Sequence, residues 1–265
     1  MEITPVPDVP ALKIKGKNER VLVVTDLHIG IEWELSQQGV SLPSQLPKLK
    51  KRLLNLIKGE RAKRLIFLGD IKHNIPVSSW QEWGEIPRLL EELSGVVEVE
   101  IIPGNHDGDI KGMVPKDVVL HDVRGVTLGE VGLVHGHAWP KPELFQTEVL
   151  VTGHDHPAVE FRDSLGGRIF EKVWLRGKLN VKKLPKKIRG AAGKEAPQFL
   201  VVPAFSELVG GAAVNGRLRE PLVGPFFRSG AVDLNRAEIY LLDGTFLGEV
   251  RNLRKLTVSP KETIF

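Results

Sequence analysis

A short loop at residues 104–107 carries three reactive side chains at consecutive positions: Asn105, His106 and Asp107. It follows the apolar run 96–102, which predicts a buried strand that a proline then ends. Asn105 can offer its carbonyl oxygen to a hard metal ion, His106 can donate a proton, and Asp107 can hold that imidazole in place. An ordinary Asn-containing turn would explain the tetrapeptide alone, so the functional interpretation depends on the rest of the chain.

The histidines of the chain are clustered. Seven of the eight lie just after an apolar run and beside Asp, Asn or Gly, and only His121 lies outside these clusters. Proteins with parallel sheets place their sites at the carboxyl ends of the strands. Five predicted strand ends therefore deliver one set of candidate metal ligands: Asp26, His28, Asp70, Asn105, His135, His154 and His156.

This ligand set predicts a site for two divalent cations. Imidazole and oxygen ligands without thiolate suit Mn, Fe, Zn or Ni better than Ca, and we expect Mn. A carboxylate can bridge two ions, and we assign that role to Asp70. Two ions about 3.5–4 Å apart would activate a water and clamp the attacking and leaving oxygens of a phosphate ester. We therefore predict a metal-dependent phosphoesterase.

The first half of the chain alternates between predicted strands and helices. Short apolar runs at 20–25, 64–68 and 96–102 predict strands, and 11–15 predicts an edge strand before them. Residues 44–58 and 78–93 have helical spacing of apolar residues, and Ser78 or Ser79 is a suitable cap for the second helix. The alternation is typical of a parallel sheet covered by helices.

The second half is rich in β-structure, with predicted strands at 118–120, 126–128, 131–134, 148–152, 159–162, 168–175, 199–203, 238–242 and 245–250. We predict one α/β domain over residues 1–265, with two packed sheets flanked by helices. Two segments are predicted to be loops. One is a basic loop at about 172–197, and the other is a Gly/Pro-rich loop at about 206–230.

Five motifs resemble, in type and in order, the signature of calcineurin-like metallophosphoesterases. They are Asp26-Leu27-His28, Gly69-Asp70, Gly104-Asn105-His106-Asp107, His135 and Gly153-His154-Asp155-His156. A looser resemblance, at Pro203-Ala204-Phe205 and Gly210-Gly211, is to an archaeal and bacterial subgroup related to the SbcD nuclease.

The family resemblance implies a four-layer α/β/β/α sandwich of two mixed β-sheets flanked by helices. It implies that His106 protonates the leaving alkoxide and that Asp107 orients His106. It also implies two ligand sets: Asp26, His28, Asp70 and His156 for one ion, and Asp70, Asn105, His135 and His154 for the other.

Other candidate residues keep two interpretations each. His73 stands where many family members have Asp, and it is either a substrate or ligand-supporting contact or a surface histidine. His137 either contacts substrate or makes a structural hydrogen bond. Asp155 either faces solvent or braces its neighbours. Trp80 and Trp83 fit packing of their helix better than stacking on bases.

The basic loop carries four closely spaced lysines: Lys182, Lys183, Lys186 and Lys187. Their mutual repulsion would be relieved by an anionic partner. We expect them to guide a nucleic-acid backbone toward the metals, with a solvated surface loop as the alternative.

Composition excludes only a few classes of protein. The net charge is 37 − 33 = +4, and there is no cysteine, which excludes disulfides. No signal peptide or membrane span is evident, so we expect a cytoplasmic protein, and the Lys and Glu content leans toward a thermophilic source. The leading prediction is a phosphodiesterase or nuclease acting on DNA or RNA, in repair. The alternatives are a phosphodiesterase or phosphatase for small molecules or cyclic nucleotides, and a non-catalytic scaffold. We leave open two protein partners, a second copy of the chain and a repair protein.

Overall fold

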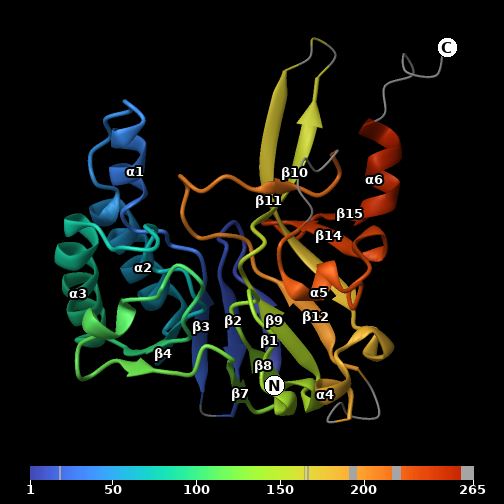
Figure 1. Ribbon diagram of the computed structural model, residues 1–265, viewed down its shortest axis with the longest axis horizontal. Helices are drawn as coiled ribbons and strands as arrows, with labels where there is room; N and C mark the ends of the chain where they lie inside the picture. The colour runs from blue at the N-terminus through green and yellow to red at the C-terminus, as the bar shows by residue number, and fades with distance from the viewer. Residues whose placement is uncertain (18, 164, 166, 191–195, 217–221, 258–265) are drawn as a thin grey trace.

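The computed structural model describes residues 1–17, 19–163, 165, 167–190, 196–216 and 222–257. Its first sheet has the strand order β1-β2-β3-β4-β5-β6 (Figure 1). From β3 to β6 the neighbours pair in parallel, and β1 and β2 pair antiparallel at the other side. The strands are β1 (Glu2–Pro5), β2 (Leu12–Lys15), β3 (Arg20–Val24), β4 (Arg64–Phe67), β5 (Glu98–Ile101) and β6 (Val119–Leu120).

The second sheet is mixed and has the order β13-β10-β11-β12-β9-β8-β7, with β14 paired to β11 and β15 paired to β14. β9 pairs in parallel with β8 and β12, whereas β11 is antiparallel to β10, β12 and β14. Its strands are β7 (Val126–Leu128), β8 (Val131–Leu133), β9 (Val149–Thr152), β10 (Pro157–Arg162), β11 (Arg168–Lys178), β12 (Gln198–Val201), β13 (Ala212–Ala213), β14 (Glu238–Leu241) and β15 (Phe246–Glu249).

The helices lie on the outer faces of the two sheets (Figure 1). The first sheet is covered by α2 (Leu46–Glu60) and α3 (Trp80–Ser94), whose apolar residues join its core, and α1 (Ile31–Gln37) lies above α2 in Figure 1. Shorter helices accompany the second sheet: α4 (Lys186–Arg189), α5 (Pro225–Arg228) and α6 (Val250–Thr257). The single 3₁₀ turns are η1 (Ile110–Gly112), η2 (Pro142–Gln146), η3 (Val181–Lys183) and η4 (Leu234–Arg236).

Three apolar cores separate the four layers, because alternate residues of a strand point to opposite faces. In β4, Leu65 and Phe67 pack toward the helices, whereas Ile66 packs between the sheets. In β11, Trp174 packs between the sheets and Val173 packs toward the outer elements. This confirms the four-layer sandwich, and it explains the continuous apolar runs, since these strands are buried on both faces.

The prediction of an edge strand at 11–15 was wrong in its position. That segment is β2, and β1 lies outside it, with Ile3 opposite Ile14. Pro5 and the neighbouring prolines obscured the strand signal of β1. An edge strand tolerates proline because the backbone N–H groups on its outer side need no partner in the sheet.

The predicted basic loop is a loop only in part. Its first residues belong to β11, which continues to Lys178, and η3 and α4 follow. Lys172 belongs to β11, where it lies opposite Ala158 of β10. The Gly/Pro-rich segment contains β13 and α5. Parts of both predicted loops, 191–195 and 217–221, lie outside the described residues.

The cap of α3 is as predicted. The Ser79 side chain accepts a hydrogen bond from the Glu82 amide, and the Glu82 carboxylate accepts one from the Ser79 amide. This reciprocal pair satisfies donors that the first turn of a helix otherwise leaves free. Among the described residues, no helix is long and apolar enough to cross a membrane.

Candidate dinuclear metal centre

The predicted metal-binding side chains meet at one edge of the two sheets. Asp26 and His28 follow β3, Asp70 follows β4, His135 follows β8, and His154 follows β9. His156 directly precedes β10. Two groups form there, Asp26 with His28 and His156, and Asp70 with His135 and His154. Within each group the candidate ligand atoms lie within 4.8 Å of one another.

These residues share an unusual backbone conformation. Five of them have positive φ: Asp26 (56°), His28 (48°), Asp70 (51°), His154 (69°) and His156 (40°). Such torsions cost side-chain-bearing residues about 1–3 kcal/mol each, although Asp and His tolerate them better than most. The turns that follow the strands aim the side chains at one point, and the rest of the fold holds this strain.

Two glycines in the motifs are required by close approach to these side chains. A Cβ on Gly104 would lie 2.1 Å from Asp70 Oδ1, and one on Gly153 would lie 2.1 Å from Thr25 Oγ1. Both distances are far below any real contact, so the loops can reach the site only without a side chain at these positions.

The site contains buried polar atoms that suit a cation. Within the part of the chain that the structure describes, four of them have no hydrogen-bond partner: Asp26 Oδ1, His28 Nε2, His135 Nε2 and His156 Nε2. Such orphaned atoms are rare in native structures. Other atoms of the same side chains are engaged, because Asp26 Oδ2 accepts from Thr25 Oγ1 at 2.9 Å and His135 Nδ1 donates to the Leu68 carbonyl at 2.7 Å. The free atoms are therefore directed into the site, as metal ligands are.

The separations between these atoms also fit shared ions. His156 Nε2 lies 3.1 Å from Asp26 Oδ1, and His135 Nε2 lies 3.2 Å from Asp70 Oδ2. Ligands that sit about 2.1 Å from one ion in a tetrahedral arrangement are about 3.4 Å apart. The residues present therefore fit a divalent cation in each group.

The electrostatics of the site place both carboxylates and two of the imidazoles in the protonation states that bind metals. Burial alone would raise the pKa of Asp26 and Asp70, but His156 beside Asp26 and His135 beside Asp70 hold both pKa values below the usual range. Burial lowers the pKa of His28 and His154 to about 3. Burial lowers the pKa of the other two imidazoles, but Asp70 beside His135 and Asp26 beside His156 outweigh it, so that the pKa of His135 is raised to about 9 and that of His156 above its usual value. Because ionised carboxylates and neutral imidazoles are the forms that bind metals, an ion bound here would displace a proton from His135 and from His156.

Asp70 occupies the position between the two groups. Its Oδ1 accepts the His106 amide at 2.9 Å, which leaves Oδ2 as the free oxygen. Oδ2 lies 3.2 Å from His135 Nε2 in one group and 3.8 Å from His28 Nε2 in the other. Asn105, the remaining predicted ligand, is exposed on the loop beside Asp70.

The predicted contact between Asp107 and His106 was wrong. Asp107 is buried, and its carboxylate accepts three backbone amides: Ile71 at 2.9 Å, Lys72 at 3.2 Å and Gly104 at 2.8 Å. It therefore ties the loop after β4 to the loop after β5. The ring of His106 is held instead by the His73 carbonyl, which accepts from His106 Nδ1. Buried amides need partners, and the carboxylate is used up in supplying them.

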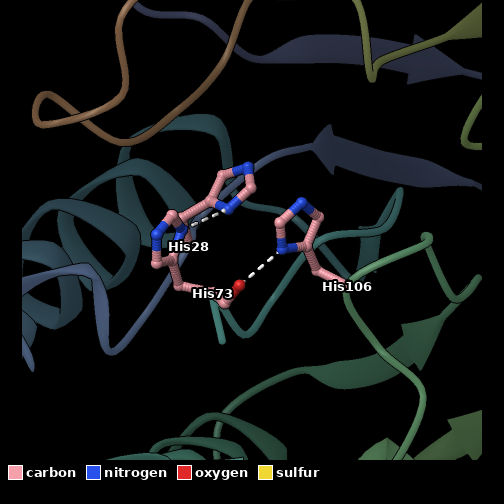
Figure 2. A group of neighbouring side chains, drawn as sticks. All are labelled: His28, His73 and His106. Carbon is pink, nitrogen blue, oxygen red and sulfur yellow. Dashed lines mark hydrogen bonds between the residues drawn. The ribbon is translucent and has the colours of Figure 1, made fainter. Parts of the chain in front are cut away.

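Figure 2 shows that His73 contacts His28 through its ring and His106 through its backbone carbonyl. His73 Nδ1 lies 3.1 Å from His28 Nδ1, and His73 Nε2 lies 2.5 Å from Glu34 Oε2 on α1. If the Nε2 proton is donated to Glu34, His73 Nδ1 accepts from His28 Nδ1, and the lone pair of His28 then lies on its orphaned Nε2. His73 is thus a support for a candidate ligand rather than a surface histidine.

We expect His73→Leu to weaken binding of one metal ion by about 10–100-fold, the typical effect of losing a partner of a ligating histidine. His73→Asn, which retains an acceptor, should recover part of the affinity. Calorimetric titration with Mn²⁺ measures both. His121→Leu is the control, because His121 bonds Glu100 away from the site. Equal affinity in the wild type and His73→Leu would contradict this role.

Glu82 fixes the segment between His73 and α3. It is fully buried, and its carboxylate accepts the amides of His73 at 2.8 Å, Asn74 at 2.7 Å and Ser79 at 2.5 Å. The sequence pattern indicated the start of this helix at Ser78 or Ser79, but it did not indicate that Glu82 binds amides of the preceding segment.

We expect Glu82→Ala to lower the free energy of unfolding by about 3 kcal/mol or more, because several buried amides lose their acceptor. Glu85→Ala on the same helix is the control, since Glu85 accepts only from Gln81. Urea denaturation compares the two. Similar losses in both variants would contradict the assigned role.

His137 and Asp155 lie close to the ligands. The His137 ring centroid is 5.4 Å from that of His135 and 6.0 Å from that of His154, and His137 Nδ1 is buried without a hydrogen-bond partner among the described residues. Burial, followed by the charge of His135, lowers the pKa of His137 to about 4. Asp155 is buried and accepts the Gly224 amide at 3.0 Å, so it braces a neighbouring loop rather than facing solvent.

Two cationic side chains beside the site, Arg52 and Lys172, were not among the predicted site residues. The guanidinium of Arg52 lies 4.4 Å above the Phe205 ring and donates to the Phe205 carbonyl at 3.0 Å. Lys172 donates to two carbonyls of the same loop, 203–206. Burial, followed by the charge of Arg52, lowers the pKa of Lys172 to about 8. Because the amide of residue 206 donates to the Asp26 carbonyl, these cations hold the loop against a ligand-bearing turn. The motif at 203–205 was the only signal for them.

The four predicted lysines lie elsewhere. β11 runs antiparallel to β12, so Lys178 at the end of β11 lies opposite Gln198 at the start of β12. β12 runs parallel to β9, and the metal-binding residues follow the end of β9. Lys178 therefore lies at the end of these strands that is far from the metal-binding residues. Lys182, Lys183, Lys186 and Lys187 follow Lys178, and α4 lies at the bottom of Figure 1. The four residues of β12 alone span about 13 Å. The structure does not bring these lysines to the site, so the expectation that they deliver a strand directly to the metals is withdrawn.

Comparisons with known proteins agree with this geometry. A family model described as calcineurin-like phosphoesterase matches residues 19–185, more than half of the chain. The crystal structure of Pseudomonas putida nuclease MPE shares the fold at 20% identity, with a TM-score of 0.54 over 91% of this chain and 98% of that chain. Yfce, a phosphoesterase from E. coli, is similar at 16% identity, with a TM-score of 0.41 over 86% and 97%. No curated protein gives a significant match. The resemblance to the SbcD-related subgroup stays a prediction.

Proposed function

The chain belongs to the calcineurin-like phosphoesterase family, which makes it a metal-dependent phosphoester hydrolase, and on that basis we propose that it is a two-metal phosphodiesterase acting on nucleic acid. The observation that carries this proposal is the pair of ligand groups on either side of Asp70 Oδ2. Mn²⁺ is the proposed ion, because the donors are imidazole and carboxylate and the chain has no thiolate.

The side chains divide the work of hydrolysis. Asp26, His28 and His156 would hold one ion, Asn105, His135 and His154 would hold the other, and Asp70 would contribute to both. When bound, the two ions supply an activated water and neutralise charge on the phosphate.

His106 is proposed as the proton donor to the leaving oxygen. Its Nδ1 is engaged by the His73 carbonyl, which orients the ring and leaves Nε2 for proton transfer. Its ring centroid is 4.8 Å from that of His28, so it lies directly beside the candidate ligands.

A substrate panel tests the proposal. Purified protein with added Mn²⁺ is given an aryl phosphodiester, an aryl monoester, cyclic nucleotides, and single- and double-stranded nucleic acid. We expect diester and nucleic-acid cleavage that EDTA abolishes, with nucleic-acid cleavage falling steeply as salt rises, because polyanion binding releases counterions.

Cleavage of cyclic nucleotides or small diesters without nucleic acid would instead favour the small-molecule alternative. Failure of the protein to retain metal after treatment with Mn²⁺ would favour a non-catalytic scaffold.

A further inference from the structure

An apolar rim, defined as Ile75, Val77, Trp80 and Trp83, projects from the segment that follows His73. Trp80 is 91% exposed, Val77 74%, Ile75 56% and Trp83 43%. Soluble proteins rarely gather large apolar side chains on one exposed segment unless they bind something there. The sequence-based expectation that Trp80 packs its own helix was therefore wrong.

The helix has no need of Trp80 for its own packing. The buried face of α3 is formed by Ile86, Leu89, Leu90 and Leu93. Trp80 stands at the first position of the helix and outside that face. Trp83 is partly packed, because a Cβ on Gly112 would lie 2.9 Å from its ring. Trp83 thus joins the rim to η1, which follows the loop that carries His106.

The rim is held rigidly beside the site. Glu82 binds two amides just before the rim and the Ser79 amide within it, and Ser78 Oγ donates to Asp109 Oδ2 at 3.1 Å. The segment begins at His73, whose carbonyl orients His106 and whose ring contacts a candidate ligand. A molecule whose phosphate lies at the candidate metals therefore has this apolar surface next to it.

Because the apolar rim continues from the phosphate site, the two surfaces together indicate what kind of ligand binds the rim. A ligand that suits both parts has a phosphodiester joined to flat, weakly polar groups, which describes an unpaired nucleic-acid strand. Aromatic side chains stack on bases of any sequence, and each such contact is worth about 1–3 kcal/mol. The carboxylate within this segment, Glu82, is buried and accepts backbone amides, and Glu34 and Asp109 are engaged with His73 and Ser78.

We propose that the apolar rim stacks on the bases of a single-stranded nucleic acid whose backbone runs to the metal centre. The inference rests on the proposed function and adds to it the substrate class, a strand with unpaired bases. Base pairs in a duplex already stack on one another, so their faces are not available to Trp80.

The test compares oligo-deoxythymidylate with an abasic strand of the same length. Binding is measured by fluorescence anisotropy in EDTA, so that neither strand is cleaved, for the wild type, Trp80→Ala, Trp80→Phe and Phe246→Ala. Phe246 is an exposed aromatic residue on β15 of the second sheet and serves as the matched control. Hydrolysis of a small aryl phosphodiester with Mn²⁺ is measured in parallel.

We expect the wild type to bind the strand with bases about 5–100-fold more tightly than the abasic strand, which is the stacking energy of one base expressed as affinity. Trp80→Ala should remove most of this difference, whereas Trp80→Phe and Phe246→Ala should retain it. Hydrolysis of the small ester should be unchanged in all four proteins.

Equal affinity of the wild type and Trp80→Ala for the strand with bases would overturn the inference, and so would equal binding of the two strands by the wild type. A wild type that hydrolyses no phosphodiester would overturn the proposed function instead. If the rim docks another protein, nucleic-acid affinity will not respond to Trp80, which also overturns the inference.

Discussion

Asp70→Asn should remove most of the activity and lower the content of both metal ions. Its Oδ2 is the free oxygen closest to His135 Nε2 and also faces His28 Nε2, so its loss affects both ligand groups. We expect kcat/KM for an aryl phosphodiester to fall by about 10³-fold or more, equivalent to about 4 kcal/mol of transition-state stabilisation. Steady-state kinetics with added Mn²⁺ and elemental analysis of the purified variant measure the two effects.

His154→Ala is the comparison for Asp70→Asn, because His154 belongs to one ligand group only. It should lower the content of one ion and leave the other in place. Asp117→Asn, which changes a carboxylate outside the site, should alter neither metal content nor activity. If Asp70→Asn keeps both ions at full occupancy, the bridging role is wrong.

His106→Ala should slow turnover while leaving metal content near that of the wild type. The ring is engaged by a backbone carbonyl and belongs to neither of the two ligand groups around Asp70. General acid catalysis typically contributes about 10²–10⁴-fold, and we expect a loss of kcat in that range for an ester with an alkyl leaving group. The loss should be smaller for a nitrophenyl ester, since nitrophenolate leaves without protonation.

Equal losses of kcat on the alkyl and nitrophenyl esters would show that His106 binds phosphate rather than donating a proton. His106 also forms a cluster with His28 and His73 whose ring nitrogens could hold an ion. A lower metal content in His106→Ala would therefore identify His106 as a ligand and contradict its role as the acid. His121→Ala should leave both measurements unchanged.

The sequence alone predicted which residue types meet at the candidate centre. Ligand types are local features, since each candidate stands one to four residues beyond a predicted apolar strand, and strand ends in an α/β sheet meet at one edge. Glycine at 104 and 153 carried the same information, because only glycine allows these loops to approach Asp70 and Thr25. The start of α3 was readable to within one residue, since Ser78 and Ser79 both suit a cap, and Ser79 is the residue that forms it.

Only the tertiary structure decided which partner each polar group takes. Asp107 stands next to His106 in sequence, yet its carboxylate is consumed by amides of two loops, and a carbonyl from residue 73 orients the imidazole instead. Lys172 and Lys182 belong to one basic stretch, but β11 runs from one edge of the sheet to the other and carries them to opposite ends. The exposure of Trp80 depends on which face of α3 meets the core. Each of these outcomes depends on contacts between residues far apart in the chain, and local sequence patterns contain no information about such contacts.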